Sequence, residues 1–256
     1  GARLAWRISG DSTFAHALAW CLAVEEMAGI LVPPRAAWLR ALLLERERIA
    51  NHLGDIGAIA NDAAFAFLLA QLSRLREEVL RLNRSLFGHR LLMDRIVPGG
   101  VSADLDAKGI EAILIEMDRL SAEFERLVVI YDENPSLQDR VVTTGIVTKK
   151  TAADLGLVGF VARASGIPSD RRVRFPFPPY DELMVREATR SNGDVNDRVW
   201  VRIEEVRESI RLIREILTRL PGGPALPSES LQVRPQPGLT GLGVVEGWRG
   251  EIVTWV

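Results

Sequence analysis

Long segments whose apolar residues recur three and four positions apart constrain this chain more than any other feature. From Asp104 to Tyr131 this spacing continues without a break, which is the pattern of a helix that buries one face. With the neighbouring cap residues, the same pattern predicts helices over 11–29, 34–62, 63–87, 104–131 and 194–219. Helices of this length with short connections favour a bundle. The expected fold is therefore mainly α: a multihelical bundle of long antiparallel helices with a small β appendage.

The C-terminal part of the chain has a different composition. The stretch "PGGPALPSESLQVRPQPG" reads as a linker, and "LGVVEGWRGEIVTWV" alternates well enough to predict a β-hairpin. We therefore divide the chain into a helical domain, 1–226, and a segment of linker and β-strands, 227–256.

Composition and missing motifs exclude several classes of protein. The net charge of −2 gives no basis for nucleic-acid binding, and no apolar run reaches the roughly 18 residues that cross a bilayer. The single cysteine, Cys21, excludes an internal disulfide and a site of several cysteines within this chain, and it favours a reducing compartment. No GxGxxG, Walker A, GxSxG or HExxH pattern occurs, so the common nucleotide-binding, hydrolase and zinc-protease functions lack support.

Charged residues share one face of the predicted helix 34–62. Glu45, Arg48 and His52 fall three and four apart, and Asp55 and Asp62 lie two turns from each other. One interpretation is a proton-handling face inside the bundle, since a histidine titrates near neutrality. The other is a solvated or salt-bridged helix face. Asp62 lies in the apolar stretch "AIANDAAFAF", where a buried charge is costly. We therefore expect its carboxylate to be poorly hydrated, in an internal cavity, and to have a functional role.

An arginine-rich loop, "ARASGIPSDRRVRF" at 162–175, surrounds a glycine and a proline. Such a loop could bind a carboxylate, a phosphate or an acidic partner surface. An exposed loop that only aids solubility explains the composition equally well.

The stretch "RISGDSTFAH", residues 7–16, has the layout of a metal site without metal ligands. A polar turn leads directly into an apolar helix, yet the two positions three apart that could chelate are Ser9 and Ser12. A serine hydroxyl is a hard and barely ionised ligand, whereas soft metals select thiolates.

Six ordered blocks give the chain a family resemblance. They are "FAHALAWCLAVEEMAGILVPPRA", "ERERIANHLGDIGAIAND", "LFGHRLLMDRIVPGGV", "ARASGIPSD", "GDVNDRVWVRIEEVRESIRLI" and "VEGWRGEI". On these blocks the chain resembles the large subunit of the nickel–iron hydrogenase superfamily. The branch is the one shared by membrane-bound hydrogenases, the formate hydrogenlyase large subunit and the complex I D-type subunit. The resemblance implies a chain that stops short of the family's C-terminal part.

The resemblance assigns roles to individual residues. Ser9 and Ser12 occupy the positions of the first nickel-ligating cysteine pair, so no metal and no nickel–iron centre are expected in this chain. The implied cavity, which holds the quinone and lies next to the cluster, contains Arg7, Gly10, His16, Asp62 and Arg163. Asp62 and His52 are the candidate catalytic residues. Gly10 replaces the tyrosine that the family uses toward the quinone, and Leu92 replaces a histidine near the cluster.

The resemblance also implies a function. The chain is expected to be a cofactor-free subunit of a membrane-associated oxidoreductase that binds NAD and quinone, of the NADH–quinone oxidoreductase or group 4 hydrogenase type. Its expected partners are a small iron–sulfur subunit, which holds the cluster, and other subunits of the complex. The expected location is peripheral, on the cytoplasmic side of the inner membrane, and the isolated chain is expected to be inactive. The alternative is a structural or assembly subunit that has kept the fold and lost the chemistry.

Overall fold

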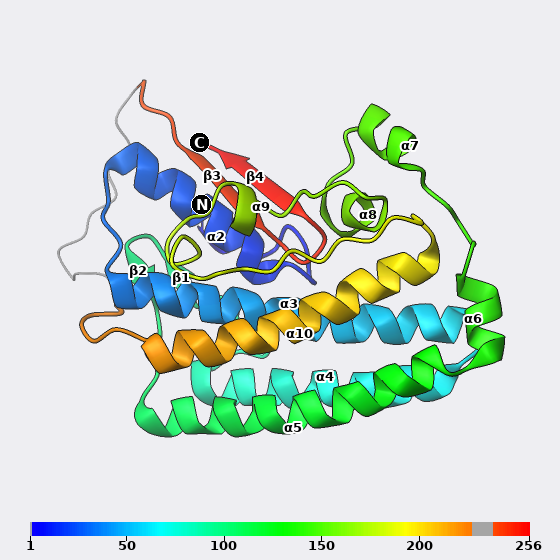
Figure 1. Cartoon of the computed structure of the whole chain (residues 1–256). Helices are drawn as coiled ribbons and strands as arrows, with labels where there is room; N and C mark the ends of the chain where they lie inside the picture. Colours follow the sequence, from blue (N-terminus) through cyan, green and yellow to red (C-terminus); the bar gives the residue numbers. More distant parts are fainter. Residues whose placement is uncertain (1, 227–237) are drawn as a thin grey trace.

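The computed structural model describes residues 2–226 and 238–256 as a helical bundle with a hairpin against one side (Figure 1). Most of the predicted linker, 227–237, lies outside the described residues. The long helices are α2 (Thr13–Ala28), α3 (Pro34–Asp62), α4 (Ala66–Phe87), α5 (Ala107–Asp132) and α10 (Val195–Arg219). The short ones are α1 (Ala2–Ala5), α6 (Pro135–Val141), α7 (Lys149–Asp154), α8 (Gly159–Ala164) and α9 (Arg171–Arg174). The strands are β1 (Ile96–Val97), β2 (Gly100–Val101), β3 (Leu242–Glu246) and β4 (Glu251–Trp255).

The five predicted helices are confirmed, and local chemistry explains where they begin and end. Pro34 starts α3, where a missing N–H costs nothing. Gly29 ends α2 at a φ of 64°, a conformation that glycine adopts without strain. The carboxylate of Asp106 accepts a hydrogen bond from the Gly109 N–H at the start of α5. Ser12 is the N-cap residue of α2, yet its side chain makes no capping bond.

Helix α3 lies at the centre of the bundle. It packs against α2 and β2, against α4, and along α10, while α5 contacts both α4 and α10 (Figure 1). None of the described helices is long and apolar enough to cross a membrane.

The predicted hairpin is confirmed as β3 paired antiparallel with β4, in the register Val244 opposite Val253. It lies directly on α2 (Figure 1). The backbone of β3 lies very close to the backbone of α2: a Cβ added at Gly243 would lie only 1.8 Å from the carbonyl oxygen of Ala19. Glycine at this position therefore allows the strand to contact the helix backbone.

This contact yields a test by substitution. Gly243→Ala should lower the free energy of unfolding by about 2 kcal/mol or more, because the new methyl group meets helix backbone that cannot move aside. Chemical denaturation of the purified chain measures the change. The control is Gly222→Ala, where a Cβ would meet nothing within 4 Å and the change should stay within about 0.5 kcal/mol. Equal effects at the two positions would show that the hairpin does not pack on α2 this closely.

Candidate functional site

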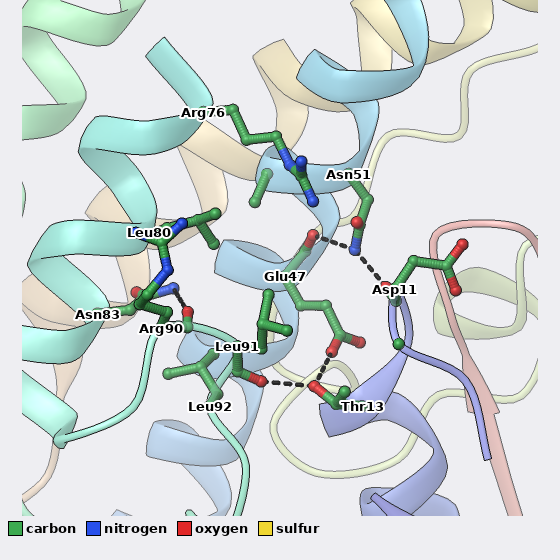
Figure 2. A pocket seen from close by; sticks show the side chains of 12 residues that line it. Asp11, Thr13, Glu47, Asn51, Arg76, Leu80, Asn83, Arg90, Leu91 and Leu92 are labelled. Carbon is green, nitrogen blue, oxygen red and sulfur yellow. Dashed lines mark hydrogen bonds between the residues drawn. The ribbon is translucent and has the colours of Figure 1, made fainter. Parts of the chain in front are cut away.

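The turn before α2 is held in place by two other elements. The Asp11 carbonyl oxygen accepts hydrogen bonds from the side-chain amide of Asn51 on α3 and from Trp248 Nε1, 3.1 Å away, in the β3–β4 turn (Figure 2 shows the first). The Asp11 carboxylate pairs with Arg249 at 2.6 Å and accepts a hydrogen bond from the Ser9 hydroxyl. The turn is thus fixed between the central helix and the hairpin.

Ser9 and Ser12 are both in this turn, Ser9 half-buried and Ser12 buried. Among the residues that the structure describes, no group of three or more His, Cys, Asp or Glu side chains could hold a metal ion. The donors of the turn are hydroxyls, so its chemistry does not fit a soft-metal centre. The expectation that this chain carries no metal stays a prediction.

A small cavity lies between the turn, α3, α4 and the segment after α4 (Figure 2). Its volume is about 10 Å³, close to the least that can hold one water molecule. Its lining is Gly10, Asp11, Thr13, Glu47, Ala50, Asn51, Arg76, Leu80, Asn83, Arg90, Leu91 and Leu92. Leu92 is buried and has a φ of 57°, which is uncommon for a leucine.

Glu47 is the buried carboxyl group of this cavity. It accepts hydrogen bonds from the backbone N–H groups of Phe14, at 2.6 Å, and Ala15, at 3.0 Å. It thereby caps α2 from another helix, which explains why Ser12 does not cap with its side chain. Burial raises the pKa of Glu47 to about 7, although these N–H groups act to lower it.

Asp11 is the second carboxyl group of the site, and it behaves differently. Burial acts to raise its pKa, but the Ser9 hydroxyl and the Arg249 guanidinium outweigh burial and hold the pKa below its usual value. Asp11 is therefore ionised at neutral pH, while Glu47 populates both protonation states.

A cluster of buried charges lies on the other side of α3. Glu205 of α10 is 2.7 Å from His52 Nε2 and 3.3 Å from Arg48, and it also pairs with Arg163. Arg163 pairs in turn with Glu246 of β3, at 2.9 Å. Burial lowers the pKa of His52, so its imidazole is neutral at pH 7 and donates Nε2–H to Glu205. The His52 ring also meets the Trp248 ring edge-on, which connects the cluster to the turn.

The cluster continues through Glu45. This carboxylate lies 3.3 Å from Arg48 and 2.9 Å from Arg172, and it accepts hydrogen bonds from Tyr180 and Ser209. The salt-bridged interpretation of the predicted charged face is confirmed, and its solvated variant is wrong for Glu45, Arg48 and His52, all of which are buried.

The arginine-rich loop turns inward. Arg163 and Arg172 are buried and bind carboxylates of this same chain, and Arg171 pairs with Glu251 at 3.0 Å. An exposed, merely solubilising loop is therefore wrong for these three residues.

The cavity residues implied by the resemblance lie in several places. Gly10 is exposed and lines the cavity, Arg7 is exposed at the start of the turn, and His16 is half-buried one turn into α2. Arg163 lies in the buried cluster instead of the cavity. Their roles toward a quinone or a cluster stay predictions.

The expected environment of Asp62 is wrong. We predicted a poorly hydrated carboxylate in an internal cavity, but Asp62 is the exposed last residue of α3. The apolar residue Ala60 of the last turn is buried, whereas Asn61 and Asp62 face solvent. The structure brings Asp62 neither to the cavity of the turn nor to the His52 cluster.

Sequence reasoning missed Glu47, Asp11 and Trp248. A signal for Glu47 was present, since four consecutive charged residues, 45–48, stand in the middle of a long helix. Successive residues point about 100° apart around a helix, so a central helix must bury at least one of them. No comparable signal marks Trp248, which reaches the turn only through the fold of the hairpin.

Comparisons with known proteins place this geometry in a family. Residues 55–241 match the family described as the respiratory-chain NADH dehydrogenase, 49 Kd subunit. The chain belongs to this family. The match begins after the turn and Glu47, so it includes α4, α5 and α10 and the part of the cavity lining that comes from α4 and the segment after it.

Individual members extend the likeness over nearly the whole chain. A carbon monoxide-induced hydrogenase of Rhodospirillum rubrum is 32% identical over 98% of this chain and 69% of its own length. An NADH-quinone oxidoreductase subunit of Roseiflexus sp. (strain RS-1) is 38% identical over 93% of this chain and 65% of its own length. A chain from the membrane-bound sulfane sulfur reductase, an archaeal respiratory membrane complex, superposes with a TM-score of 0.92 at 26% identity. That superposition covers all of this chain and 70% of the other.

The raised pKa of Glu47 in this member of the 49 Kd family predicts a pH dependence of stability. Between pH 4.5 and about 7 the folded chain holds a proton on Glu47 that the unfolded chain has released. The contribution of Glu47 to the free energy of unfolding is therefore fully present below pH 4.5 and is lost as the pH rises through 7. The loss is roughly 3 kcal/mol for a shift of this size.

Glu47→Gln cannot ionise and should remove this slope. Urea denaturation of both chains at several pH values measures the effect, and the wild type should lose its stability advantage over the variant as the pH approaches 7. Parallel stability curves for the two chains across pH 4.5–7 would contradict the raised pKa.

Proposed function

We propose that this chain is a subunit of a membrane-associated redox complex of the NADH–quinone oxidoreductase or group 4 hydrogenase type. The family membership and the names of its relatives support this, since those proteins are a hydrogenase, quinone oxidoreductase subunits and part of a respiratory membrane complex. The chain spans about two thirds of the length of the Rhodospirillum and Roseiflexus relatives and about half of the length of others. The complete protein's activity is therefore part of the proposal.

Within that complex we assign the turn at 9–12 to the wall of the reaction cavity. The observation that carries the assignment is a turn that reaches the surface at Gly10 and adjoins Glu47, a buried carboxyl group with a pKa raised to about 7. Reducing a quinone consumes protons as well as electrons, so its site needs a proton-exchanging group beside a surface that an electron donor can reach. A partner iron–sulfur subunit would face the turn and supply the electrons.

Exposed apolar side chains around the turn support a partner at this position. Leu4 and Ile8 flank Arg7 and are 72% and 64% exposed. Such residues next to a functional turn fit a surface that another subunit covers. We place the complex on the cytoplasmic side of the inner membrane with this chain peripheral to the bilayer.

The chemistry assigned to this chain involves no metal of its own. Ser9 and Ser12 stand where thiolates would be needed, and Ser9 donates its hydroxyl proton to Asp11. These residues do not fit a nickel–iron centre, so no step is routed through one. NAD binding belongs to other subunits, because this sequence contains no GxGxxG pattern.

An assembly role is the second candidate. It is favoured by the way His52 and Arg163 are paired internally with Glu205, because groups engaged in this way stabilise the fold without handling a substrate. The reaction-cavity role and the assembly role predict different effects of a substitution in the turn at 9–12.

Gly10→Leu distinguishes them. A Cβ added at Gly10 would meet nothing within 4 Å, so we expect the fold to tolerate leucine while its bulk fills the space in front of the turn. In the assembled complex, electron transfer to a short-chain quinone should fall about ten-fold or more, with the iron–sulfur partner still co-purifying. Gly222→Leu, also without neighbours within 4 Å, is the control and should leave turnover unchanged.

Two other results of the Gly10→Leu experiment would argue against the cavity role. Loss of the partner in Gly10→Leu would favour the assembly role over the cavity role. Normal assembly together with normal turnover would contradict the placement of the reaction cavity at this turn.

A further inference from the structure

The surroundings of Glu47 allow this residue to do more than cap α2. Its carboxylate is enclosed by α2, α3 and the segment after α4, and a water-sized cavity adjoins it (Figure 2). The exposed residue Gly10 lines the same cavity, so the cavity reaches toward the surface at the turn. A proton can therefore travel between solvent and Glu47 through one water molecule.

Positive charge near Glu47 is present but indirect. Arg48 on α3 lowers the pKa of Glu47 through space, yet its guanidinium binds Glu205 and the hairpin. Arg90 is held by Glu77 through two hydrogen bonds. Arg76 of α4 lines the cavity, and its buried Nε has no hydrogen-bond partner among the described residues. Asp11 of the turn is the one other carboxyl group lining the cavity.

Thr13 favours the ionised form of Glu47. Its hydroxyl is within donating reach of Glu47 Oε2, at 3.3 Å, and of the carbonyl oxygen of Leu91 (Figure 2). A hydrogen bond donated to the carboxylate acts to lower the pKa of Glu47.

The backbone at the start of α2 favours the same form. The N–H groups of Phe14 and Ala15 stabilise an ionised carboxylate. Burial opposes these hydrogen bonds and raises the pKa of Glu47 to about 7, so both protonation states are populated near neutrality. The ionisation of Glu47 changes how firmly the first turn of α2 is capped. A charge change at Glu47 is transmitted directly to the turn at 9–12.

We propose that Glu47 is the proton-holding residue of this site, loaded from solvent through the cavity and discharged toward the turn when the acceptor there is reduced. This inference rests on the proposed function. Two electrons come from the partner's iron–sulfur cluster. One proton comes from the Glu47 carboxyl group, whose O–H bond breaks as an O–H bond forms on the quinone oxygen. Solvent supplies the second proton and then reprotonates Glu47.

The first test observes the proton itself in the full chain. With ¹³C-carboxyl-labelled glutamate, one NMR signal should titrate near pH 7 and be absent from Glu47→Gln. Glu133→Gln, at an exposed position of the bundle, is the control and should leave that signal in place. A spectrum in which no glutamate titrates above about pH 6 would overturn the inference.

Thr13→Val tests the hydrogen-bond argument. If the Thr13 hydroxyl donates to an ionised Glu47, its removal should raise the midpoint of the Glu47 titration by about half a unit or more. A lowered midpoint would show that the Thr13 oxygen accepts the proton of Glu47 and would overturn this part of the account.

Turnover supplies the functional test in the assembled complex with a short-chain quinone. The turnover rate of the wild type should change with pH around a pKa near 7. Glu47→Gln should lack this pH dependence and should turn over about ten-fold or more slowly. An unchanged pH profile in Glu47→Gln would overturn the assignment even if the NMR signal titrates near 7. Failure of the Gly10→Leu prediction would instead overturn the proposed function and leave the titration of Glu47 unaffected.

Discussion

Four consecutive charged side chains, buried in the middle of α3, determine how the rest of the structure is arranged. Residues 45–48 are each at most 8% exposed, and because they point in four directions, each needs a partner on a different neighbour. Glu45 binds α9 and α10, Arg46 binds α4 and α5, Glu47 caps α2, and Arg48 binds α10 and the hairpin. An uncompensated charge at this depth would cost several kcal/mol, so these partners fix the relative positions of the elements.

The candidate site arises where this arrangement leaves a charge without a counterion. Glu45, Arg46 and Arg48 each form at least one ion pair, whereas in the described part of the chain no cation lies within ion-pair distance of Glu47. Backbone N–H groups replace the counterion, and they do not offset the cost of burial in full. The carboxyl group therefore has a pKa raised to about 7, immediately beside the turn that contains Ser9 and Ser12. The same residue serves the fold as a cap and the site as a titrating group.

Much of the fold could be predicted from the sequence, because helix length and the hairpin follow from local periodicity and turn chemistry. The resemblance also indicated the family correctly. The site was harder, since periodicity shows which residues share a helix face but not how deeply each lies along the helix. The apolar sequence around Asp62 and the family resemblance placed this exposed residue in a cavity, and neither they nor periodicity indicated Glu47. The internal pairing of Arg163 depends on contacts across 42 and 83 positions of the chain, which local sequence patterns do not contain.

The most direct test of this account is the stability of Arg48→Met. Arg48 pairs with Glu45 and Glu205 and donates to two carbonyl oxygens of the hairpin, so its loss takes a cation from two buried carboxylates and a donor from two backbone acceptors. Arg207→Met, which removes an ion pair about 40% exposed on each side, is the matched control. Chemical denaturation should show a loss of about 3–5 kcal/mol for Arg48→Met and of less than about 1 kcal/mol for Arg207→Met. Equal losses in the two variants would contradict the central role of the buried charges on α3.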